Sequence, residues 1–235
     1  AWGDGGDGQL AQNSRTDYSS PVQVGSGTDW FRVSNGPGGS KKHHAIKGDG
    51  TLWSWGYNRL GALGLNNRTY YSSPVQIPGT NWKEVNNSYT IFGGIKTDNT
   101  LWICGSNNNG QQLNGQPSNA NRSSPVQVPG TTWDHIYAGH QSQYHSIKTD
   151  GTLWNWGSND KGELGHNNRT TYSSPKQVGT DTTWSRFAAS GTPQNRVCVA
   201  VKTDGTIWSW GGKNAGGGLG QNENGANTYY SSPTQ

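Results

Sequence analysis

Three histidines spaced five residues apart, His135, His140 and His145, are the side chains of this sequence that most resemble a metal site. A zinc-type site needs about four ligands close together. The chain contains no Cys-x-x-Cys or His-x-x-His pair, and its two cysteines, Cys104 and Cys198, are far apart. We therefore predict structural histidines, two buried thiols rather than a disulfide, and no metal or other cofactor.

Acid–base catalysis is not indicated either, because the acidic residues stand in repeated turn sequences. Each of four aspartates precedes Gly-Thr or Asn-Thr: Asp49, Asp98, Asp150 and Asp204. General acid–base catalysis needs titratable groups in different environments, and the nucleophile elbow Gly-x-Ser-x-Gly is missing. The segment Asp4-Gly-Gly-Asp7-Gly looks like a calcium loop, but it aligns with a glycine-rich loop that recurs later. The sequence predicts a protein without enzymatic activity.

Arginine and tyrosine recur along the chain and are the first candidates for binding, since both types often carry binding energy at interfaces. The recurring members are Arg15, Arg68, Arg122, Arg169, Tyr18, Tyr71 and Tyr172. Because they return in copy after copy, we favour a structural role, in which each tyrosine packs under its own strands and each arginine bonds a neighbouring turn.

A second set of candidates lies where the copies differ from one another. Variable loops on a rigid scaffold commonly carry recognition. These loops and their edges contain Lys41, Lys42, Tyr89, Gln141, Gln143 and Arg196. They are the stronger indication of a binding surface, because a departure from a repeat is not explained by the repeat itself.

The elements that position these residues follow from a repeat of about fifty residues. Ser-Ser-Pro-x-Gln occurs five times, and its prolines are 53, 51, 50 and 58 residues apart. Ile-Lys-x-Asp-Gly-Thr-Leu-Trp-x-Trp-Gly and close variants occupy residues 46–56, 95–105, 147–157 and 201–211. Gly-x-Leu-Gly occupies residues 61–64, 162–165 and 217–220, with degenerate copies at 8–10 and 110–113. A lone tryptophan follows each Gly-Thr region, at Trp30, Trp82, Trp133 and Trp184.

Each repeat predicts four short antiparallel strands. Asp-Gly between Ile-Lys and Leu-Trp predicts a tight hairpin with a type I′ turn. Alternation places Trp53 and Trp55 on one face of their strand, and Gly56 ends it. Pro-Val-Gln-Val predicts a further strand with proline at its first position, and Trp82 to Val85 predicts another. No segment has helical periodicity.

This order of motifs resembles the regulator-of-chromosome-condensation repeat, whose His-Ser step is matched at His145-Ser146. The resemblance implies an all-β propeller of four-stranded blades. Full blades are expected at 24–76, 77–127, 128–177 and 178–235, with the second half of a blade at 1–23. Relatives commonly close a ring of about seven blades. Because four and a half blades would leave open strand edges, we expect an arc of a longer chain or edges covered by a partner. The absence of methionine and the start at Ala1 also suggest a processed or excerpted chain.

Composition narrows the function. Apolar residues make up 29% of the chain, and mean hydropathy is −0.90, yet twelve Trp and ten Tyr argue against disorder. No apolar run approaches the ~18 residues of a membrane span. The net charge of +4 comes without basic clusters, which argues against nucleic acid.

The favoured function is therefore a non-enzymatic scaffold that binds a protein partner, located outside the cytoplasm on a cell surface or a virion of bacterial or phage type. Carbohydrate binding through exposed Trp and Tyr is the alternative. A role as an inhibitor or guanine-nucleotide exchange factor, which the resemblance implies for some relatives, is a further alternative.

Overall fold

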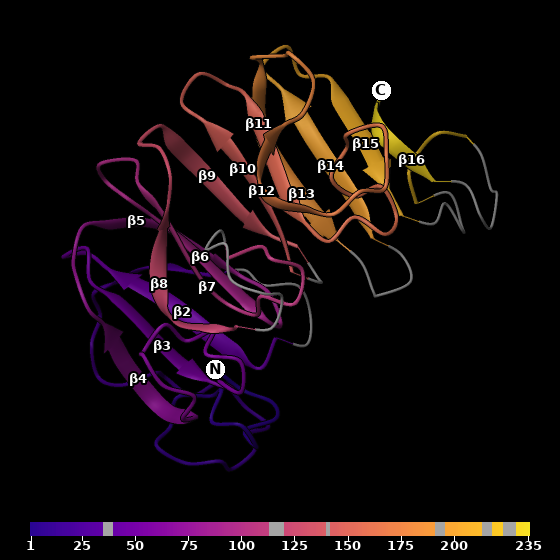
Figure 1. Cartoon of the computed structure of the whole chain (residues 1–235). Coiled ribbons are helices and arrows are strands. Elements are labelled where there is room, and N and C mark those ends of the chain that lie inside the picture. Colours follow the sequence, from indigo (N-terminus) through magenta and orange to yellow (C-terminus); the bar gives the residue numbers. More distant parts are fainter. Residues whose placement is uncertain (35–39, 113–119, 140–141, 191–195, 213–217, 223–228) are drawn as a thin grey trace. The chain divides into compact units, whose positions relative to one another are not determined.

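The computed structural model describes all residues except 35–39, 113–119, 140–141, 191–195, 213–217 and 223–228. The described residues form sixteen strands and no helix, arranged as four antiparallel sheets of four strands (Figure 1). The chain divides into two compact units, with residues 1–106 and 120–131 in unit 1 and residues 107–119 and 132–235 in unit 2. None of the described residues forms a helix long and apolar enough to cross a membrane.

Unit 1 contains two sheets whose strands follow one another in sequence order, which is the blade arrangement of a propeller. The first sheet consists of β1 (Trp30–Val33), β2 (Lys42–Lys47), β3 (Leu52–Gly56) and β4 (Tyr71–Ile77). The second consists of β5 (Trp82–Asn87), β6 (Ile91–Lys96), β7 (Leu101–Gly105) and β8 (Arg122–Val128).

Unit 2 repeats this arrangement with two further sheets. One is built from β9 (Trp133–Ala138), β10 (Gln143–Lys148), β11 (Leu153–Gly157) and β12 (Tyr172–Gln177). The other is built from β13 (Trp184–Ser190), β14 (Val197–Lys202), β15 (Ile207–Gly211) and β16 (Tyr230–Thr234). The fourth strand of every sheet contains a Ser-Ser-Pro sequence, so the motif that defines the repeat also closes each sheet.

The predicted Asp-Gly hairpins are present, but their turn type differs from the prediction. Between β2 and β3 the Gly50 amide donates to the Lys47 carbonyl at 3.0 Å, and Gly50 has φ +77° while Asp49 has no positive φ. A type I′ turn needs positive φ at both of its central residues, which Asp49 does not provide. The turn runs instead from Lys47 to Gly50, with Gly50 as its left-handed last residue. Asp49 Oδ1 accepts from the backbone N–H of Thr51 at 2.9 Å and from its hydroxyl at 2.7 Å. These two hydrogen bonds from Thr51 stabilise a backbone conformation in which Asp49 keeps a negative φ.

The strand predicted to begin at proline begins earlier. β4 starts at Tyr71, and its register to β3 shifts between the pairs Ser54–Val75 and Gly56–Tyr71. Pro74 lies in this irregular stretch, at the outer strand of the sheet. Proline lacks the N–H that a regular ladder needs, so an edge strand with a bulge accommodates it.

Residues 1–29 contain no strand, although a half blade was expected at 1–23. An isolated antiparallel bridge joins Gly3 and Tyr18, and the Val22 amide donates to the Ala1 carbonyl at 2.9 Å (indigo in Figure 1). Ala1 and Gly3 thus pair with Val22 and Tyr18 where the third and fourth strands of a blade would lie, as Gly56 pairs with Tyr71 in the first sheet. The segment keeps this pairing and the loops of a blade without a continuous strand ladder.

Neighbouring sheets of each unit are joined where two sequence motifs meet. A Cβ added to Gly61, in Gly-x-Leu-Gly, would lie 2.6 Å from Ser123 Cα, in the next Ser-Ser-Pro. The Asn66 amide donates to the Ser123 carbonyl at 2.7 Å, and in unit 2 Asn167 makes the same bond to Ser231 at 2.6 Å. Only glycine permits this approach, which explains why both motifs recur.

Candidate functional site

In each unit, one loop before Ser-Ser-Pro is held by an asparagine that follows Trp-x-Trp-Gly. In unit 1 Asn58 Nδ2 donates to the carbonyls of Asn67 and Thr69, both at 3.0 Å, while its Oδ1 accepts from the Leu63 amide at 2.9 Å. Asn159 makes the equivalent three bonds in unit 2, to Asn168, Thr170 and Leu164. These fully buried amides make the loops a rigid base for the side chains above them.

Two of the predicted tyrosines bond to their own loops. The hydroxyl of Tyr71 accepts from Asn67 Nδ2 at 3.0 Å, and that of Tyr172 accepts from Asn168 Nδ2 at 3.0 Å. Tyr18 is half-buried in the loop segment of unit 1. The structure thus gives Tyr71 and Tyr172 the structural contacts that the repeat suggested.

The recurring arginines differ from loop to loop. Arg15 lies over the ring of Tyr70 at 6.0 Å, and Arg169 over that of Tyr229 at 5.3 Å, so each reaches the loop of the next blade. Arg169 Nε also donates to the Asp160 carbonyl at 2.6 Å. Arg68 is exposed, whereas Arg122 is half-buried at the start of β8.

Arg15 belongs to a group of side chains that the structure brings together in unit 1. Tyr57 packs against Tyr70 with ring centroids 5.0 Å apart, and it stacks on Tyr89 at 5.6 Å. We call Arg15, Tyr57, Tyr70 and Tyr89 the tyrosine cluster. They come from four separate segments: the N-terminal loops, the loop after β3, the residue before β4, and the β5–β6 turn. Tyr89 is 43% exposed, so the cluster has an open surface.

The rings of the cluster affect one another. Burial and the hydroxyls of the neighbouring tyrosines raise the pKa of Tyr57 to about 12, so its phenol is neutral at physiological pH. A neutral phenol can donate and accept hydrogen bonds. The cluster therefore combines flat apolar rings, phenol groups and one exposed guanidinium.

Lys42, a predicted binding residue, is buried beneath this cluster, so its placement in an exposed loop was wrong. Its ammonium nitrogen donates to the backbone carbonyls of Ser88 and Tyr89, the latter at 2.9 Å. Asn87 Nδ2 donates back to the Lys42 carbonyl at 3.1 Å. Burial lowers the pKa of Lys42 to about 7. The residue fixes the turn that carries Tyr89. Its neighbour Lys41 is exposed and paired with Asp7 at 2.9 Å.

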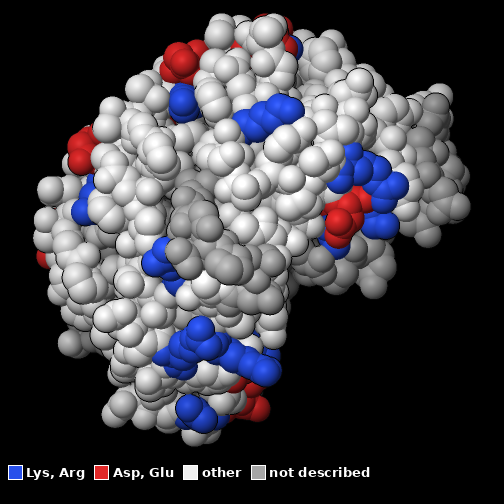
Figure 2. Space-filling view, in the orientation of Figure 1, with Lys and Arg blue, Asp and Glu red and all other residues white. Residues whose placement is uncertain are grey.

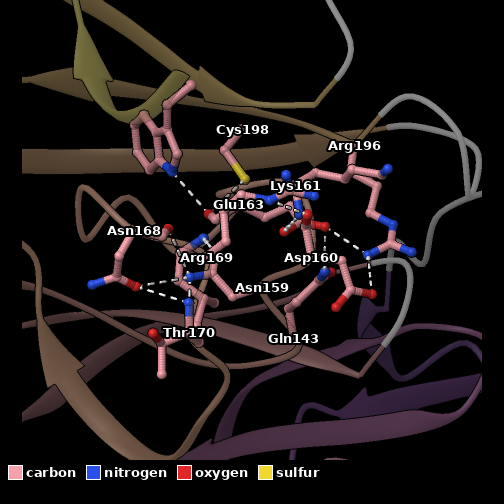
Figure 3. A network of polar contacts seen from close by, with 12 residues as sticks. Gln143, Asn159, Asp160, Lys161, Glu163, Asn168, Arg169, Thr170, Arg196 and Cys198 are labelled. Carbon is pink, nitrogen blue, oxygen red and sulfur yellow. Dashed lines mark hydrogen bonds and ion pairs between the residues drawn. The ribbon is translucent and has the colours of Figure 1, made fainter. Parts of the chain in front are cut away.

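Gln143 and Arg196 are also buried, which corrects their prediction as loop residues on the surface (Figure 3). Arg196 Nη1 and Glu163 Oε1 form an ion pair at 2.6 Å, and Gln143 Nε2 donates to the same oxygen at 3.2 Å. Figure 3 also shows Cys198 approaching the Glu163 backbone, with its sulfur 3.3 Å from the carbonyl oxygen. A buried carboxylate needs such partners, so the network joins the two sheets of unit 2. Gln141 lies outside the described residues.

The prediction of a structural histidine is confirmed at His145. His145 is fully buried and stacks on Phe187 with centroids 4.3 Å apart, joining the two sheets of unit 2. Desolvation lowers its pKa to about 3. His135 is partly exposed beside Asp134, and His140 lies outside the described residues. Both thiols are buried, and neither is in a disulfide. No group of three or more His, Cys, Asp or Glu gathers as a metal site in the described part.

Most tryptophans pack inside the sheets rather than on the surface. Six of the twelve are buried, five are half-buried, and Trp2 is exposed at 64%. Four of the half-buried rings, Trp53, Trp102, Trp154 and Trp208, have a lysine ammonium over them at 3.9 to 5.0 Å. Open tryptophan platforms for sugar rings, as the carbohydrate alternative assumed, are therefore scarce.

Sequence reasoning missed Tyr57 and Tyr70. Tyr57 did carry a signal, because Ser106, Ser158 and Gly212 occupy its position in the other copies. Tyr70 carried no such signal, because the aligned loop of the last copy also has a tyrosine, at Tyr229. Its contact with Tyr57 depends on two loops meeting.

Comparisons with known proteins agree with this architecture. The family model of the regulator of chromosome condensation (RCC1) repeat matches residues 49–86 and 150–192. The chain is therefore similar to RCC1-repeat proteins in these two segments. It is 24% identical over 94% of its length to the ultraviolet-B receptor UVR8 of Arabidopsis thaliana, of which it spans half.

Solved structures place the chain in the propeller fold. Human WBSCR16 superposes over 99% of this chain and 61% of its own with a TM-score of 0.80 and 18% identity. Prp20p of Saccharomyces cerevisiae superposes over 99% of this chain and 57% of its own with a TM-score of 0.78 and 17% identity. The all-β propeller prediction is confirmed. The chain spans half to three fifths of these relatives.

Proposed function

We propose that this chain is a non-enzymatic scaffold that binds a protein partner through the tyrosine cluster. The exposure of Tyr89 at 43%, on a turn fixed by buried Lys42, is the observation that carries the proposal. Tyrosine and arginine supply much of the binding energy at protein interfaces. Because the turn is already ordered, little conformational entropy is lost on binding.

Relatives support protein binding as the general role. Yeast Prp20 has been solved with Kap60 bound, and its binding to Gsp1p and histones has been studied. On the face drawn in Figure 2, Lys and Arg form small separate groups, several beside acidic residues, which does not favour nucleic acid. A folded protein or a peptide is the partner class that the cluster suits.

The test measures binding of purified Kap60, Gsp1p and histones by biolayer interferometry. Tyr89→Ala and Arg15→Ala should each weaken binding of the probe at least about fivefold, since truncated interface anchors cost more than about 1 kcal/mol. Ile207→Ala, at an even more exposed apolar residue of unit 2, is the control and should change nothing. Equal binding by the wild type and Tyr89→Ala would contradict the proposed surface. Binding of none of the three probes would remove the support that the relatives provide.

The exchange alternative is separable from simple binding. A purified small GTPase loaded with a fluorescent guanine nucleotide would lose it faster when this chain is added, if exchange is the function. An unchanged release rate at saturating chain concentration would exclude that role for the GTPase used.

We also propose a location outside the cytoplasm, on a cell surface or a virion. Support comes from the low charged content of 14% and the abundance of glycine and polar uncharged residues. Antibodies against the folded chain should label intact cells or particles of the source. Labelling that appears only after lysis would contradict the location.

A further inference from the structure

The side chains of the tyrosine cluster form a row in unit 1. Tyr57 is its middle ring, because it packs against Tyr70 with centroids 5.0 Å apart and against Tyr89 with centroids 5.6 Å apart. The outer two rings are therefore at most about 11 Å from each other, the sum of these two distances. Arg15 lies 6.0 Å from the centroid of Tyr70. The row thus has aromatic rings along its length and a cation at the Tyr70 end.

The backbone beneath the rings is fixed before any partner arrives. The segment that precedes Tyr70 is bonded to Asn58, the residue after Tyr57, and the turn that carries Tyr89 is bonded to buried Lys42. Binding therefore orders few new groups, and little of the interaction energy is lost to conformational entropy.

The phenol hydroxyls of the row are available to a partner. Burial, and then the hydroxyls of Tyr89 and Tyr70, raise the pKa of Tyr57 to about 12, so the phenol keeps its proton at physiological pH. Among the described residues, none of the three hydroxyls bonds to a group outside the cluster. A neutral phenol can donate to a carbonyl oxygen. The row therefore offers hydroxyl donors beside flat apolar ring faces.

Arg15 carries a charge that the described residues leave without a carboxylate. Its guanidinium is exposed and forms no salt bridge among them. Asp17, the nearest acidic residue in the sequence, uses Oδ1 to accept from the Gly5 amide at 2.9 Å. By contrast, the exposed Lys41 of the same unit is paired with Asp7 at 2.9 Å. A partner with a carboxylate at this end of the row can form a bidentate pair with Arg15.

The place of the cluster in the fold selects among the ways in which proteins bind peptides. Strand addition needs a free sheet edge, but all four cluster residues lie outside the strands. An amphipathic helix needs an apolar groove, whereas the cluster presents aromatic rings and hydroxyls. A polyproline II helix docks on aromatic rings and has no internal hydrogen bonds, so its carbonyls are free to accept. Its rise of about 3.1 Å per residue places prolines three positions apart at roughly 9 Å, which fits the length of the row.

We propose that the tyrosine cluster binds a proline-rich segment in the polyproline II conformation, with an acidic residue beside its prolines. Prolines three positions apart pack on Tyr70 and Tyr89, and the carbonyls between them accept from the phenol hydroxyls. The acidic residue pairs with Arg15. This inference rests on the proposed function, because it names the class of partner for the same surface.

Isothermal titration calorimetry on the full chain tests the proposal with capped synthetic peptides. The probe has proline at every third position and a glutamate beside a terminal proline, placed at the N-terminal end in one version and at the C-terminal end in the other. One of the two versions should bind with a Kd on the order of 0.1 mM. Replacement of every proline by alanine should weaken binding at least about tenfold, because the alanine peptide is not preorganised. A further peptide carries glutamine in place of the glutamate.

Variants of the chain separate the ring contacts from the charge contact. Tyr89→Ala should weaken probe binding at least about fivefold, because it removes an exposed ring of the row. Arg15→Ala should remove the preference for glutamate over glutamine and leave the affinity for the glutamine peptide nearly unchanged. Arg169→Ala is the matched control, since Arg169 lies 5.3 Å from the Tyr229 centroid in unit 2, where no described ring packs against that tyrosine. This control should bind every peptide as the wild type does.

Three results would overturn the proposal: no binding of either glutamate version, binding of the alanine peptide as tight as that of the probe, or equal probe affinity of the wild type and a folded Tyr89→Ala. Thermal unfolding establishes that the variant is folded. Failure of this inference is distinct from failure of the proposed function. If Kap60, Gsp1p or a histone binds the wild type more tightly than Tyr89→Ala while no proline peptide binds, the surface is correct and the partner class is wrong. If Tyr89→Ala changes the binding of neither proteins nor peptides, both are wrong.

Discussion

At the scale of single residues, the chain places ionisable groups where their charge is disfavoured. Lys42 is buried in unit 1 and donates to two backbone carbonyls. A neutral amine still has two N–H groups, one for each carbonyl. His145 is buried in unit 2 against Phe187. Both pKa values are lowered by desolvation, to about 7 and about 3. Stability should therefore depend on pH at both positions.

For Lys42 the folded state binds fewer protons than the unfolded state between pH 7 and the ordinary lysine value of 10.5. The free energy of unfolding should therefore rise with pH across that window. Lys42→Gln keeps N–H donors but does not titrate, so its rise should be smaller by at least about 1 kcal/mol. Urea unfolding at pH 7 and pH 9.5 measures the difference, and parallel curves for the two proteins would contradict it.

For His145 the folded state excludes the proton between pH 6.5 and about 3, so stability falls as pH decreases through this range. His145→Phe removes the titration and keeps a ring against Phe187. The variant should lose less stability than the wild type between pH 7 and pH 4, measured by thermal unfolding. Equal losses would show that other groups dominate acid unfolding. His166, which also has a lowered pKa, is the neighbouring histidine to compare through His166→Phe.

At the scale of elements, the joints between sheets depend on close backbone approach. Gly61 combines a left-handed conformation at φ +78° with Ser123 in near contact. Asn58 then holds the loop that follows by three hydrogen bonds. The loop held by Asn58 and the contact of Gly61 with Ser123 together position Tyr57 and Tyr70. The tyrosine cluster therefore depends on the packing of the residues that lie under it.

Gly61→Ala should destabilise the chain more than the left-handed conformation alone explains. Gly25→Ala is the matched control, because Gly25 has φ +63° and nothing within 4 Å of the added methyl group. The control should cost about 1 kcal/mol from backbone strain. Gly61→Ala should cost a further ~1–3 kcal/mol from the clash with Ser123. Equal losses for the two variants in urea unfolding would argue against the close approach.

At the scale of the whole molecule, the described chain has two compact units, and in each a buried charged or polar side chain joins the two sheets. This polar joint is Lys42 in unit 1 and the Glu163–Arg196 pair in unit 2. The pair has side chains only 1% and 8% exposed, so removing one partner leaves a buried charge. Changes at either joint should be felt mainly in the unit that contains it.

Glu163→Gln should cost about 3–5 kcal/mol, the usual effect of breaking a buried ion pair. Asp181→Asn removes a salt bridge to Lys202 in which the carboxylate is 54% exposed, and it should cost less than about 1 kcal/mol. Amide hydrogen exchange should show the loss of protection in β10, β14 and β15 of unit 2, with β2 and β6 of unit 1 unchanged. Uniform loss across both units would contradict independent joints.

Most of the fold follows from the repeat. Its four-strand pattern, the ends of the third strands at glycine and the burial of the tryptophans result from local alternation and turn residues. The predicted turn type and the predicted start of the fourth strand were wrong, because a capping hydrogen bond and a bulge decide them. Both depend on atoms that a pattern of residue types does not place.

The candidate site was predicted less well. Arg15 and Tyr89 were predicted as candidates, but their meeting with Tyr57 and Tyr70 arises from loops that are distant in sequence. Lys42, Gln143 and Arg196 were interpreted as surface residues because variable, polar segments are usually exposed. The amino-acid sequence is enough to define the repeated sheets, since the information for them is local. Which polar residues are buried at the joints, and which tyrosines meet in one cluster, is decided in the folded chain alone, because both depend on how one sheet packs against the next.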